Sequence, residues 1–352
     1  MKTHRIAIYP GDGIGVEVTD QAVRVLEALQ GRDFALELTR LPWGSAYHAN
    51  HGHVAPPDFL DVLRPFDAIF LGALGDPARI PDHVTLAPLI RLRQAFDQYA
   101  CVRPARLLRG VRSPLASPEA RKIDLVVLRE NSEGEYVDSG GRFKTGRPEE
   151  FALQTAIHTR RGIERILRFG FEMARGRRKH LTMITKSNAQ KYGFVLWDEI
   201  LEEMRPKYPD LRVDKEHVDA ASMNFVRRPE AYDVVVGSNL FGDILSDLGG
   251  CLAGGLGLAA SANLNPERAL PSMFEPVHGS APDIAGQGIA NPTAAILAAA
   301  MMLDWLGEKA AADRVNRAVE ETLARGHGTP DLGGTLDTRG LADRILAALS
   351  GA

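Results

Sequence analysis

The chain has 352 residues, of which 45% are hydrophobic and 25% charged, and its formal net charge is −3. These values are typical of a globular protein and exclude a disordered or collagen-like chain. The weak negative charge gives no electrostatic reason to expect a nucleic acid or a membrane surface as partner. Two cysteines exclude a disulfide framework, so we expect a cytoplasmic protein.

Short apolar runs alternate with longer helical patterns along the chain. In chain order, the pattern predicts a strand at residues 5–9, a helix at 15–29 and a strand at 34–41, followed by strands at 68–71, 123–128, 181–185, 213–218 and 234–236. Such alternation is typical of βαβ units and predicts an α/β fold with a largely parallel sheet. The apolar run at residues 6–9 is too short for a secretory signal.

Two later regions break this rhythm. Residues 134–147 are rich in glycine and charge, and the β-like residues 151–159 follow, so we expect a protruding arm that could serve a dimer contact. From residue 291 the chain is rich in alanine and leucine, which predicts helices at 291–306 and 309–324. The length allows two domains. Because no linker separates them in sequence, two domains would be wound together.

Asp243 and Asp247 are four residues apart, so a helix would place both carboxylates on one face. Two like charges repel unless a cation lies between them, and hard oxygen ligands favour Mg²⁺ or Mn²⁺. The alternative is an exposed polar face. Asp219 follows a predicted strand and would suit the same ion, although such a residue often caps a helix instead.

Arg93, Arg103 and Arg129 each lie at the edge of an apolar segment. Guanidinium groups bind carboxylates through two hydrogen bonds, so three converging arginines would suit a dicarboxylic acid, whereas isolated ones would form surface ion pairs. Lys186 ends a predicted strand, where α/β enzymes place functional groups. Beside a cation it could act as a base. Tyr136 could be an acid or an exposed residue of the arm.

The turn at residues 11–15, Gly-Asp-Gly-Ile-Gly, follows the first predicted strand, but its spacing is not that of a dinucleotide-binding Rossmann turn. We expect only a tight turn there. The loop-forming segment from Glu275 to Asn291 is a better nucleotide site. Asp283 in that segment could accept a hydrogen bond from a ribose hydroxyl and would repel a 2′-phosphate, which favours NAD over NADP.

Together, the segments at residues 11–15, 239–247 and 274–291 resemble the β-decarboxylating dehydrogenases, the family of isopropylmalate, isocitrate, and tartrate or D-malate dehydrogenases. The resemblance spans nearly the whole chain. It implies an isopropylmalate dehydrogenase-like α/β/α sandwich without a Rossmann motif. A large domain would combine residues 1–99 and 252–352, and a small domain would span 100–251, with a dimer arm at about 134–158.

The resemblance also implies the site residues and their partners. The substrate would lie between Arg93, Arg103 and Arg129 and an apolar wall of Leu86, Leu89 and Ile90. Mg²⁺ or Mn²⁺ would be bound by Asp219, Asp243 and Asp247, and catalysis would use Tyr136 and Lys186. NAD would contact Asn188, Glu275, His278, Gly279, Ser280, Ala281, Asp283, Ile284 and Asn291. K⁺ is an additional candidate ion. In a homodimer, Lys186 and Asp219 would serve the partner's active site.

The substrate predicted from this resemblance is a small 2-hydroxy dicarboxylic acid. Apolar groups beside Arg93 give the extra carboxylate of isocitrate no partner. Isopropylmalate enzymes also present an apolar surface here, usually with a glutamate where Leu86 stands. Residues 80–84, 96–99, 130–136, 185–188 and 262–268 resemble the tartrate and D-malate branch, which usually has asparagine where Cys101 stands. The alternatives are an isopropylmalate dehydrogenase and a non-catalytic regulatory subunit.

Overall fold

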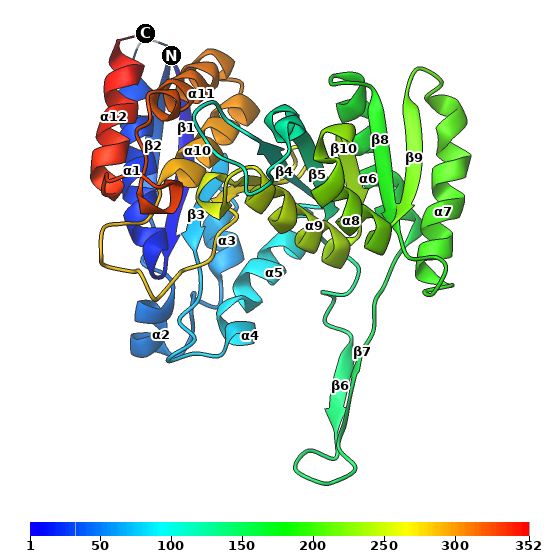
Figure 1. The fold of residues 1–352 in the computed structure, drawn as a ribbon. Helices are drawn as coiled ribbons and strands as arrows, with labels where there is room; N and C mark the ends of the chain where they lie inside the picture. The colour runs from blue at the N-terminus through cyan, green and yellow to red at the C-terminus, as the bar shows by residue number, and fades with distance from the viewer. Residues whose placement is uncertain (32, 352) are drawn as a thin grey trace.

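The computed structural model describes residues 1–31 and 33–351, and a large mixed β-sheet runs through its centre (Figure 1). Among the described residues, ten strands form this sheet in the order β2-β1-β3-β12-β11-β4-β5-β10-β8-β9. Their bounds are β1 (Lys2–Gly11), β2 (Phe34–Arg40), β3 (Ala68–Ala73), β4 (Ala100–Arg106), β5 (Asp124–Glu130), β8 (His180–Thr185), β9 (Arg212–His217), β10 (Val234–Gly237), β11 (Ala260–Leu264) and β12 (Ser272–Pro276).

Strands run parallel in the two outer parts of the sheet and antiparallel at its centre. β2, β1, β3 and β12 are parallel to one another, and so are β5, β10, β8 and β9. β11 and β4 join these groups through antiparallel pairing. The predicted α/β fold is confirmed. The domain boundaries stay a prediction, because the sheet continues without a break from one proposed domain to the other.

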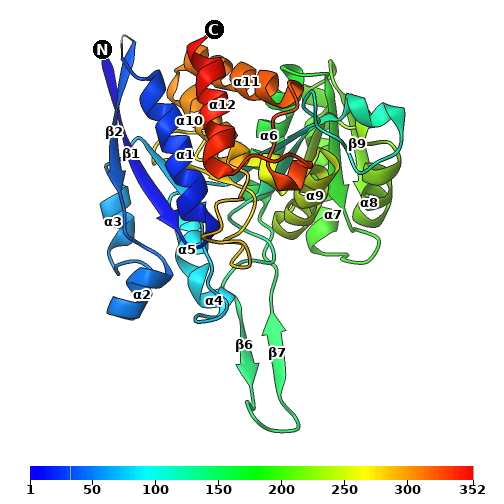
Figure 2. The same cartoon turned by 60° about the vertical axis from the view of Figure 1, so that its left-hand side comes forward.

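Helices pack on both faces of this sheet (Figures 1 and 2). Over the half that holds both chain ends, four helices pack together: α1 (Ile14–Leu29), α10 (Thr293–Leu306), α11 (Lys309–Ala324) and α12 (Thr338–Ser350). On the other half lie α6 (Arg160–Arg175), α7 (Gly193–Met204), α8 (Val218–Arg227) and α9 (Asn239–Leu252). The shorter helices are α2 (Ser45–His51), α3 (Phe59–Leu63), α4 (Asp82–Thr85) and α5 (Ala87–Ala95). Within the described part of the chain, no helix has both the length and the apolar character needed to cross a bilayer.

The central strands alternate polar and apolar side chains. One row of paired residues across the sheet holds Arg129, Cys101 and Asn263. The adjacent row is apolar and consists of Leu128, Val102, Ala262 and Phe274, all buried in the main core. Because successive side chains of a strand point to opposite faces, the middle of the sheet has one polar face and one face that packs under α10.

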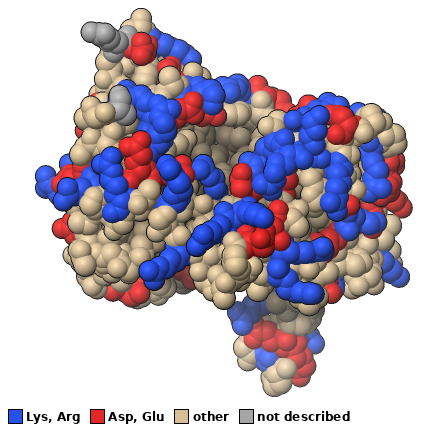
Figure 3. All heavy atoms as spheres, turned by 45° about the horizontal axis from the view of Figure 1, so that its top comes forward, with Lys and Arg blue, Asp and Glu red and all other residues tan. Residues whose placement is uncertain are grey.

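A two-stranded arm projects from the body between Gly134 and Ile157, whose backbones bridge at its base (Figure 2). Its strands are β6 (Gly140–Phe143) and β7 (Phe151–Gln154). Phe143 and Phe151 stack with ring centroids 4.9 Å apart, yet both remain exposed. On the face drawn in Figure 3, basic and acidic side chains lie close together over most of the surface.

The predicted strands and helices all lie within or next to observed elements, with small shifts at their ends. The sequence pattern does not predict β4, β11 or β12. Pro104 weakens the strand pattern of β4, since a proline cannot donate a ladder hydrogen bond. It is tolerated because β11 pairs with β4 only from Ala100 to Val102. β11 and β12 are five residues each and carry polar side chains inside the fold, so their apolar signal is weak.

The turn at residues 11–15 holds three loops together by close backbone packing. Gly13 has φ 53°, and Ile14 N donates to the carbonyl oxygen of Ser280 at 2.8 Å. Asp12 accepts hydrogen bonds from Ser45 N at 2.6 Å and from Gly75 N at 3.0 Å. A Cβ added at Gly13 would lie 2.1 Å from the Ser280 oxygen, so glycine is required by the space as well as by the backbone angle.

Gly13→Ala should destabilise the fold by about 3 kcal/mol or more, because strain at positive φ adds to a steric clash. Gly52→Ala is the matched control, since Gly52 has φ 74° but nothing within 4 Å of an added Cβ. It should cost only about 1–2 kcal/mol. Urea unfolding of both variants measures the difference, and equal losses would contradict the packing role of the turn.

Candidate active site

A pocket with a volume of about 190 Å³ opens over the polar face of the central strands. It is smaller than the roughly 300–1,000 Å³ sites that hold drug-sized ligands, so it suits a small acid. α5 and the residue before it form one wall, and α9 contributes to the opposite side. The predicted site residues that line it are Leu86, Leu89, Ile90, Arg93, Arg103, Arg129, Tyr136, Asp243, Glu275, His278 and Gly279.

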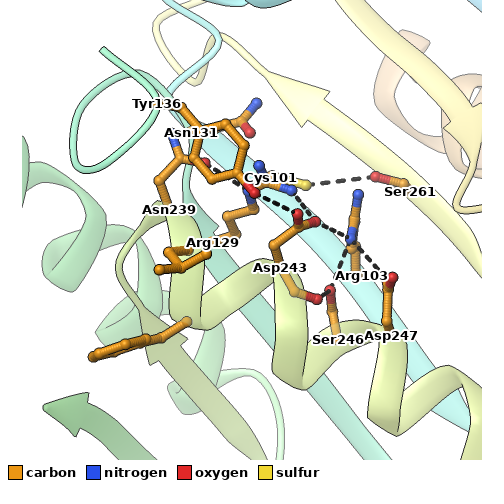
Figure 4. Close-up of polar contacts among 12 residues, drawn as sticks. Cys101, Arg103, Arg129, Asn131, Tyr136, Asn239, Asp243, Ser246, Asp247 and Ser261 are labelled. Atoms are coloured by element: carbon orange, nitrogen blue, oxygen red, sulfur yellow. Dashed lines mark hydrogen bonds and ion pairs between the residues drawn. The ribbon is translucent and has the colours of Figure 1, made fainter. Parts of the chain in front are cut away.

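Asp243 and Asp247 lie one turn apart on α9, as their spacing predicts. Ser238 caps this helix by accepting a hydrogen bond from Phe241 N at 3.4 Å. The side chains of Asp243 and Asp247 are 30% and 52% exposed. Both turn toward Arg103, whose Nη1 donates to Asp243 at 3.0 Å and to Asp247 at 3.2 Å (Figure 4). The pair is therefore tied to the arginine cluster, unlike carboxylates on an ordinary solvated helix face.

Arg129 is the second buried guanidinium group beside α9. Its Nη1 is hydrogen-bonded to Asp243 Oδ1, and its Nε donates to Asn239 Oδ1 at 2.8 Å. Gly242 makes this approach possible, because an added Cβ would lie 2.6 Å from Cβ of Arg129. Ser246 Oγ accepts a hydrogen bond from Arg103 Nη1 at 2.8 Å. Asn239 and Ser246 are therefore site residues that the sequence analysis missed. Their only signal was their place in the same helix as the two aspartates.

Arg93 enters the pocket from α5 together with the predicted apolar wall. Its Nη2 donates to Glu275 Oε1 at 2.7 Å, and its Nε is buried without a hydrogen-bond partner among the described residues. Arg103 Nε is also buried without a hydrogen-bond partner among the described residues. Buried donors of this kind favour an anionic ligand. Arg93, Arg103 and Arg129 thus converge as the sequence interpretation required.

The ion pairs set the charges in the pocket. Burial raises the pKa of Asp243, but Arg129 and Arg103 outweigh it and leave that pKa below its usual value. Burial raises the pKa of Asp247 above its usual value, only partly opposed by Arg103. Burial also lowers the pKa of Arg129 and, with Asp243, raises the pKa of Tyr136. Asp243 is therefore the more strongly ionised of the two aspartates.

Tyr136 reaches the pocket from the base of the arm. Its hydroxyl donates to Asp243 Oδ2 at 2.9 Å, and the guanidinium carbon of Arg129 lies 5.0 Å from the centre of its ring. Tyr136 is thus a pocket residue in this structure and does not lie on the exposed part of the arm. With its raised pKa, the hydroxyl keeps its proton near neutral pH.

Lys186 and Asp219 form a separate pair. Lys186 Nζ donates to Asp219 Oδ1 at 2.7 Å, and this hydrogen bond lowers the pKa of Asp219. Among the described residues, neither lines the pocket that contains Asp243. Within one chain, the structure therefore divides the predicted metal and catalytic residues between two places, and the role of a partner subunit stays a prediction.

The residues present fit Mg²⁺ or Mn²⁺ only in part. Asp243 and Asp247 offer the hard oxygen ligands that these ions prefer. However, residues 1–31 and 33–351 contain no cluster of three or more His, Cys, Asp or Glu that could hold an ion. One chain supplies two carboxylates, so further oxygen ligands would have to come from the substrate, water or a second chain.

The predicted nucleotide segment follows β12 and packs against the turn at residues 11–15 through Ser280. His278 Nε2 is buried without a partner among the described residues, and burial lowers the pKa of His278, so this nitrogen is free for a polar ligand. Asp283 and Asn188 are exposed. Asn291 is buried, and its side chain bonds internally to Asp331 and Thr293 N, each at 3.0 Å. The segment therefore fits a nucleotide at His278 and Asp283 better than at Asn291. Gly279 is exposed, while Ala281 and Ile284 are half-buried.

Glu130 follows Arg129 at the end of β5, where its side chain points to the opposite face of the sheet from that of Arg129. It is buried and accepts hydrogen bonds from Ser132 Oγ at 2.6 Å and from Glu133 N at 2.8 Å. Burial nevertheless raises the pKa of Glu130 to about 7. Its nearest guanidinium group is that of Arg165 on α6, 3.9 Å from Glu130 Oε1, so this carboxyl lies outside the arginine cluster of the pocket.

Comparison with known proteins agrees with this geometry. The sequence model of the isocitrate/isopropylmalate dehydrogenase family matches residues 5–345. The chain is 50% identical to the D-malate dehydrogenase (decarboxylating) of Escherichia coli strain K12, with 98% of each chain covered. It is also 50% identical to a probable tartrate dehydrogenase/decarboxylase of Agrobacterium vitis, covering 100% of this chain and 97% of that one. The structure of isocitrate dehydrogenase from Methylococcus capsulatus superposes with a TM-score of 0.88 at 40% identity, covering 98% and 99% of the two chains.

The chain belongs to the isocitrate/isopropylmalate dehydrogenase family. The family resemblance seen in the sequence is therefore confirmed, and so is the isopropylmalate dehydrogenase-like fold. Within the family, its similar relatives include decarboxylating dehydrogenases named for D-malate and for tartrate.

Glu130→Gln should change the pH dependence of stability. A carboxyl with a pKa raised from 4.5 to about 7 binds more protons in the folded state, so its contribution to stability is present at low pH and is lost as pH rises through that range. Relative to the variant, the wild type should lose up to roughly 3 kcal/mol between pH 4.5 and 7. Urea unfolding at several pH values measures this, and a constant difference would contradict the raised pKa.

Proposed function

We propose that the protein oxidises D-malate or tartrate with NAD and Mg²⁺ or Mn²⁺, and then decarboxylates the product. D-malate would yield pyruvate and CO2. One observation carries this proposal: Arg103 and Arg129 meet Asp243 at a pocket sized for a small acid, and Arg103 also holds Asp247 one turn further along α9. The names of relatives that are half identical over their whole length support the same two substrates.

The charges in the pocket support a dianionic substrate bound together with a divalent cation. Three guanidinium groups, of Arg93, Arg103 and Arg129, face the carboxylates of Asp243, Asp247 and Glu275. These charges are already balanced. Adding a diacid and a doubly charged cation leaves the balance unchanged, whereas either one alone would bury an excess charge. The arginine forks would hold the two carboxylates of the substrate.

The apolar wall beside Arg93 supports a substrate without a third carboxylate. Leu86, Leu89 and Ile90 line this side of the pocket and offer no hydrogen-bond donor to the extra carboxylate of isocitrate. The same wall would accept the apolar branch of 3-isopropylmalate, which makes that acid the second candidate. A regulatory subunit without activity is the weakest candidate, because every predicted metal and catalytic residue is present in the chain.

The chemistry expected of the bound groups is hydride acceptance by NAD and polarisation of the substrate oxygen by the cation. Lys186 would accept the hydroxyl proton as a general base. Tyr136, which keeps its proton near neutral pH, would donate it to the carbon that carried the lost CO2. Asp283 would select NAD by repelling a 2′-phosphate.

A homodimer would complete this active site. Three apolar side chains are exposed here: Met223 (58%) and Val226 (46%) on α8, and Ile244 (53%) on α9. Ile244 directly follows Asp243, one of the two carboxylates proposed to bind the metal. The arm adds the exposed Phe143 and Phe151. Apolar surface of this kind favours a protein partner. A second copy covering it could bring the partner's Lys186 and the partner's Asp219 to the pocket. The cytoplasmic location stays a prediction from the low cysteine content.

Side-by-side assays of the purified protein with NAD and Mn²⁺ test the substrate. D-malate and tartrate should be turned over in preference to 3-isopropylmalate and isocitrate, because of the small pocket and its apolar wall. EDTA should abolish activity and Mn²⁺ should restore it. Pyruvate formed from D-malate identifies the decarboxylation. Turnover of 3-isopropylmalate alone would move the protein to the second candidate, and activity in EDTA would contradict the metal site.

Hybrid dimers test the shared active site. Lys186→Met and Asp243→Asn should each be inactive alone. After denaturation and refolding together, the mixture should recover about a quarter of wild-type activity, because half the dimers are hybrids and each hybrid has one intact site. Refolded wild type is the control for recovery. A mixture that stays inactive while the control recovers would place Lys186 in its own chain's site.

A further inference from the structure

A buried row of polar side chains runs beneath the arginine cluster. Asn131 follows β5, Asn263 lies in β11 and Glu275 lies in β12, and all three are buried. Asn131 Nδ2 donates to Asn263 Oδ1 at 2.9 Å, and Asn263 Nδ2 donates to Glu275 Oε1 at 2.7 Å. The row ends at Arg93, whose Nη2 donates to the same Glu275 oxygen at 2.7 Å. The segment after β5 and the strands β11 and β12 are thus connected to one guanidinium group on α5.

Glu275 Oε1 accepts from both Asn263 and Arg93, so the amide limits where the carboxylate can turn. A buried carboxylate with a single partner could rotate toward another cation. Arg103 is close enough for Glu275 to contribute to the raised pKa of that arginine. The amide of Asn263 therefore favours the rotamer of Glu275 that pairs with Arg93.

Fully burying an amide costs free energy unless its hydrogen bonds are made. Asn263 has no exposed surface and lies in the middle of the sheet, with β12 on one side and β4 on the other. Its neighbours Ala262 and Leu264 point to the apolar face of the sheet, whereas Asn263 faces Asn131 and Glu275 on the polar face. The amide at position 263 is therefore explained by its hydrogen bond to Glu275.

We propose that Asn263 is a positioning residue for the substrate. Through Glu275 it fixes the orientation of Arg93, so that the remaining donors of that guanidinium group face the pocket. This inference rests on the proposed role of Arg93 in binding the diacid. It assigns no contact between Asn263 and the substrate, and Asn263 does not line the pocket.

Asn263→Asp tests the proposal with almost no change in side-chain size. The introduced carboxyl can still accept a hydrogen bond from Asn131. It cannot donate to Glu275, and its negative charge repels the Glu275 carboxylate and disturbs the pairing of Glu275 with Arg93. The KM for the diacid should rise about tenfold, with a smaller change in kcat and in the KM for NAD.

A swap of amide and carboxyl provides the rescue. In the double variant Asn263→Asp, Glu275→Gln, an amide again faces a carboxylate, so the KM for the diacid should recover most of the loss caused by Asn263→Asp alone. A double-mutant cycle measured by urea unfolding should show coupling between the two positions. This second readout does not depend on the substrate, so it separates failure of the network from failure of the proposed function.

Asn265→Asp is the matched control. Asn265 is buried directly after the end of β11, and its Nδ2 donates to the backbone oxygens of Phe96 and Asp97, each at 3.2 Å. Glu275→Gln should not rescue it. If Asn263→Asp does not fold, Asn263→Ser removes the amide that donates to Glu275 and leaves a shorter side chain, so it should raise the same KM. Additive effects at positions 263 and 275, or an unchanged KM for the diacid in a folded Asn263 variant, would overturn the proposal.

Discussion

The arrangement of the site depends on the neutralisation of two buried guanidinium groups. Arg103 and Arg129 extend from adjacent antiparallel strands into a region with little water, where an unpaired charge would be strongly destabilising. The carboxylates of α9 supply the compensation, and Gly242 lets the helix come close enough to do so. The ion pairs thus fix the position of α9 over the sheet and, with it, the two carboxylates proposed to bind the metal.

The two faces of the central strands have different roles. The polar face forms the floor of the pocket, and the apolar face belongs to the main hydrophobic core under α10. A strand can do both because its side chains alternate between faces. The groups that would bind the substrate are therefore held on strands whose other face is buried in the main hydrophobic core. Such rigidity suits a site that must orient a small acid against a cofactor, since small displacements are costly for catalysis.

The separation of Lys186 and Asp219 from the pocket gives the quaternary structure a chemical meaning. α8 and α9 present exposed apolar side chains beside the carboxylates proposed to bind the metal, and the arm carries further exposed aromatic rings. Under the proposed function, covering this surface and completing the active site are a single event. Assembly would then protect apolar surface and also prevent a lone chain from carrying out partial chemistry.

The sequence by itself determined the outer strands, the helices α1, α10 and α11, the one-turn spacing of Asp243 and Asp247 and, through its resemblance, the family. These features depend on local periodicity and on short motifs, which a single sequence displays. Only the tertiary structure decided that β4, β11 and β12 lie at the centre, that the three arginines converge, and that Asn239, Ser246 and Asn263 support them. Convergence depends on tertiary contacts between residues as distant in sequence as Arg93 and Glu275, and no local pattern encodes such contacts. The division of the catalytic residues likewise became visible only when Lys186 and Asp243 were placed in space.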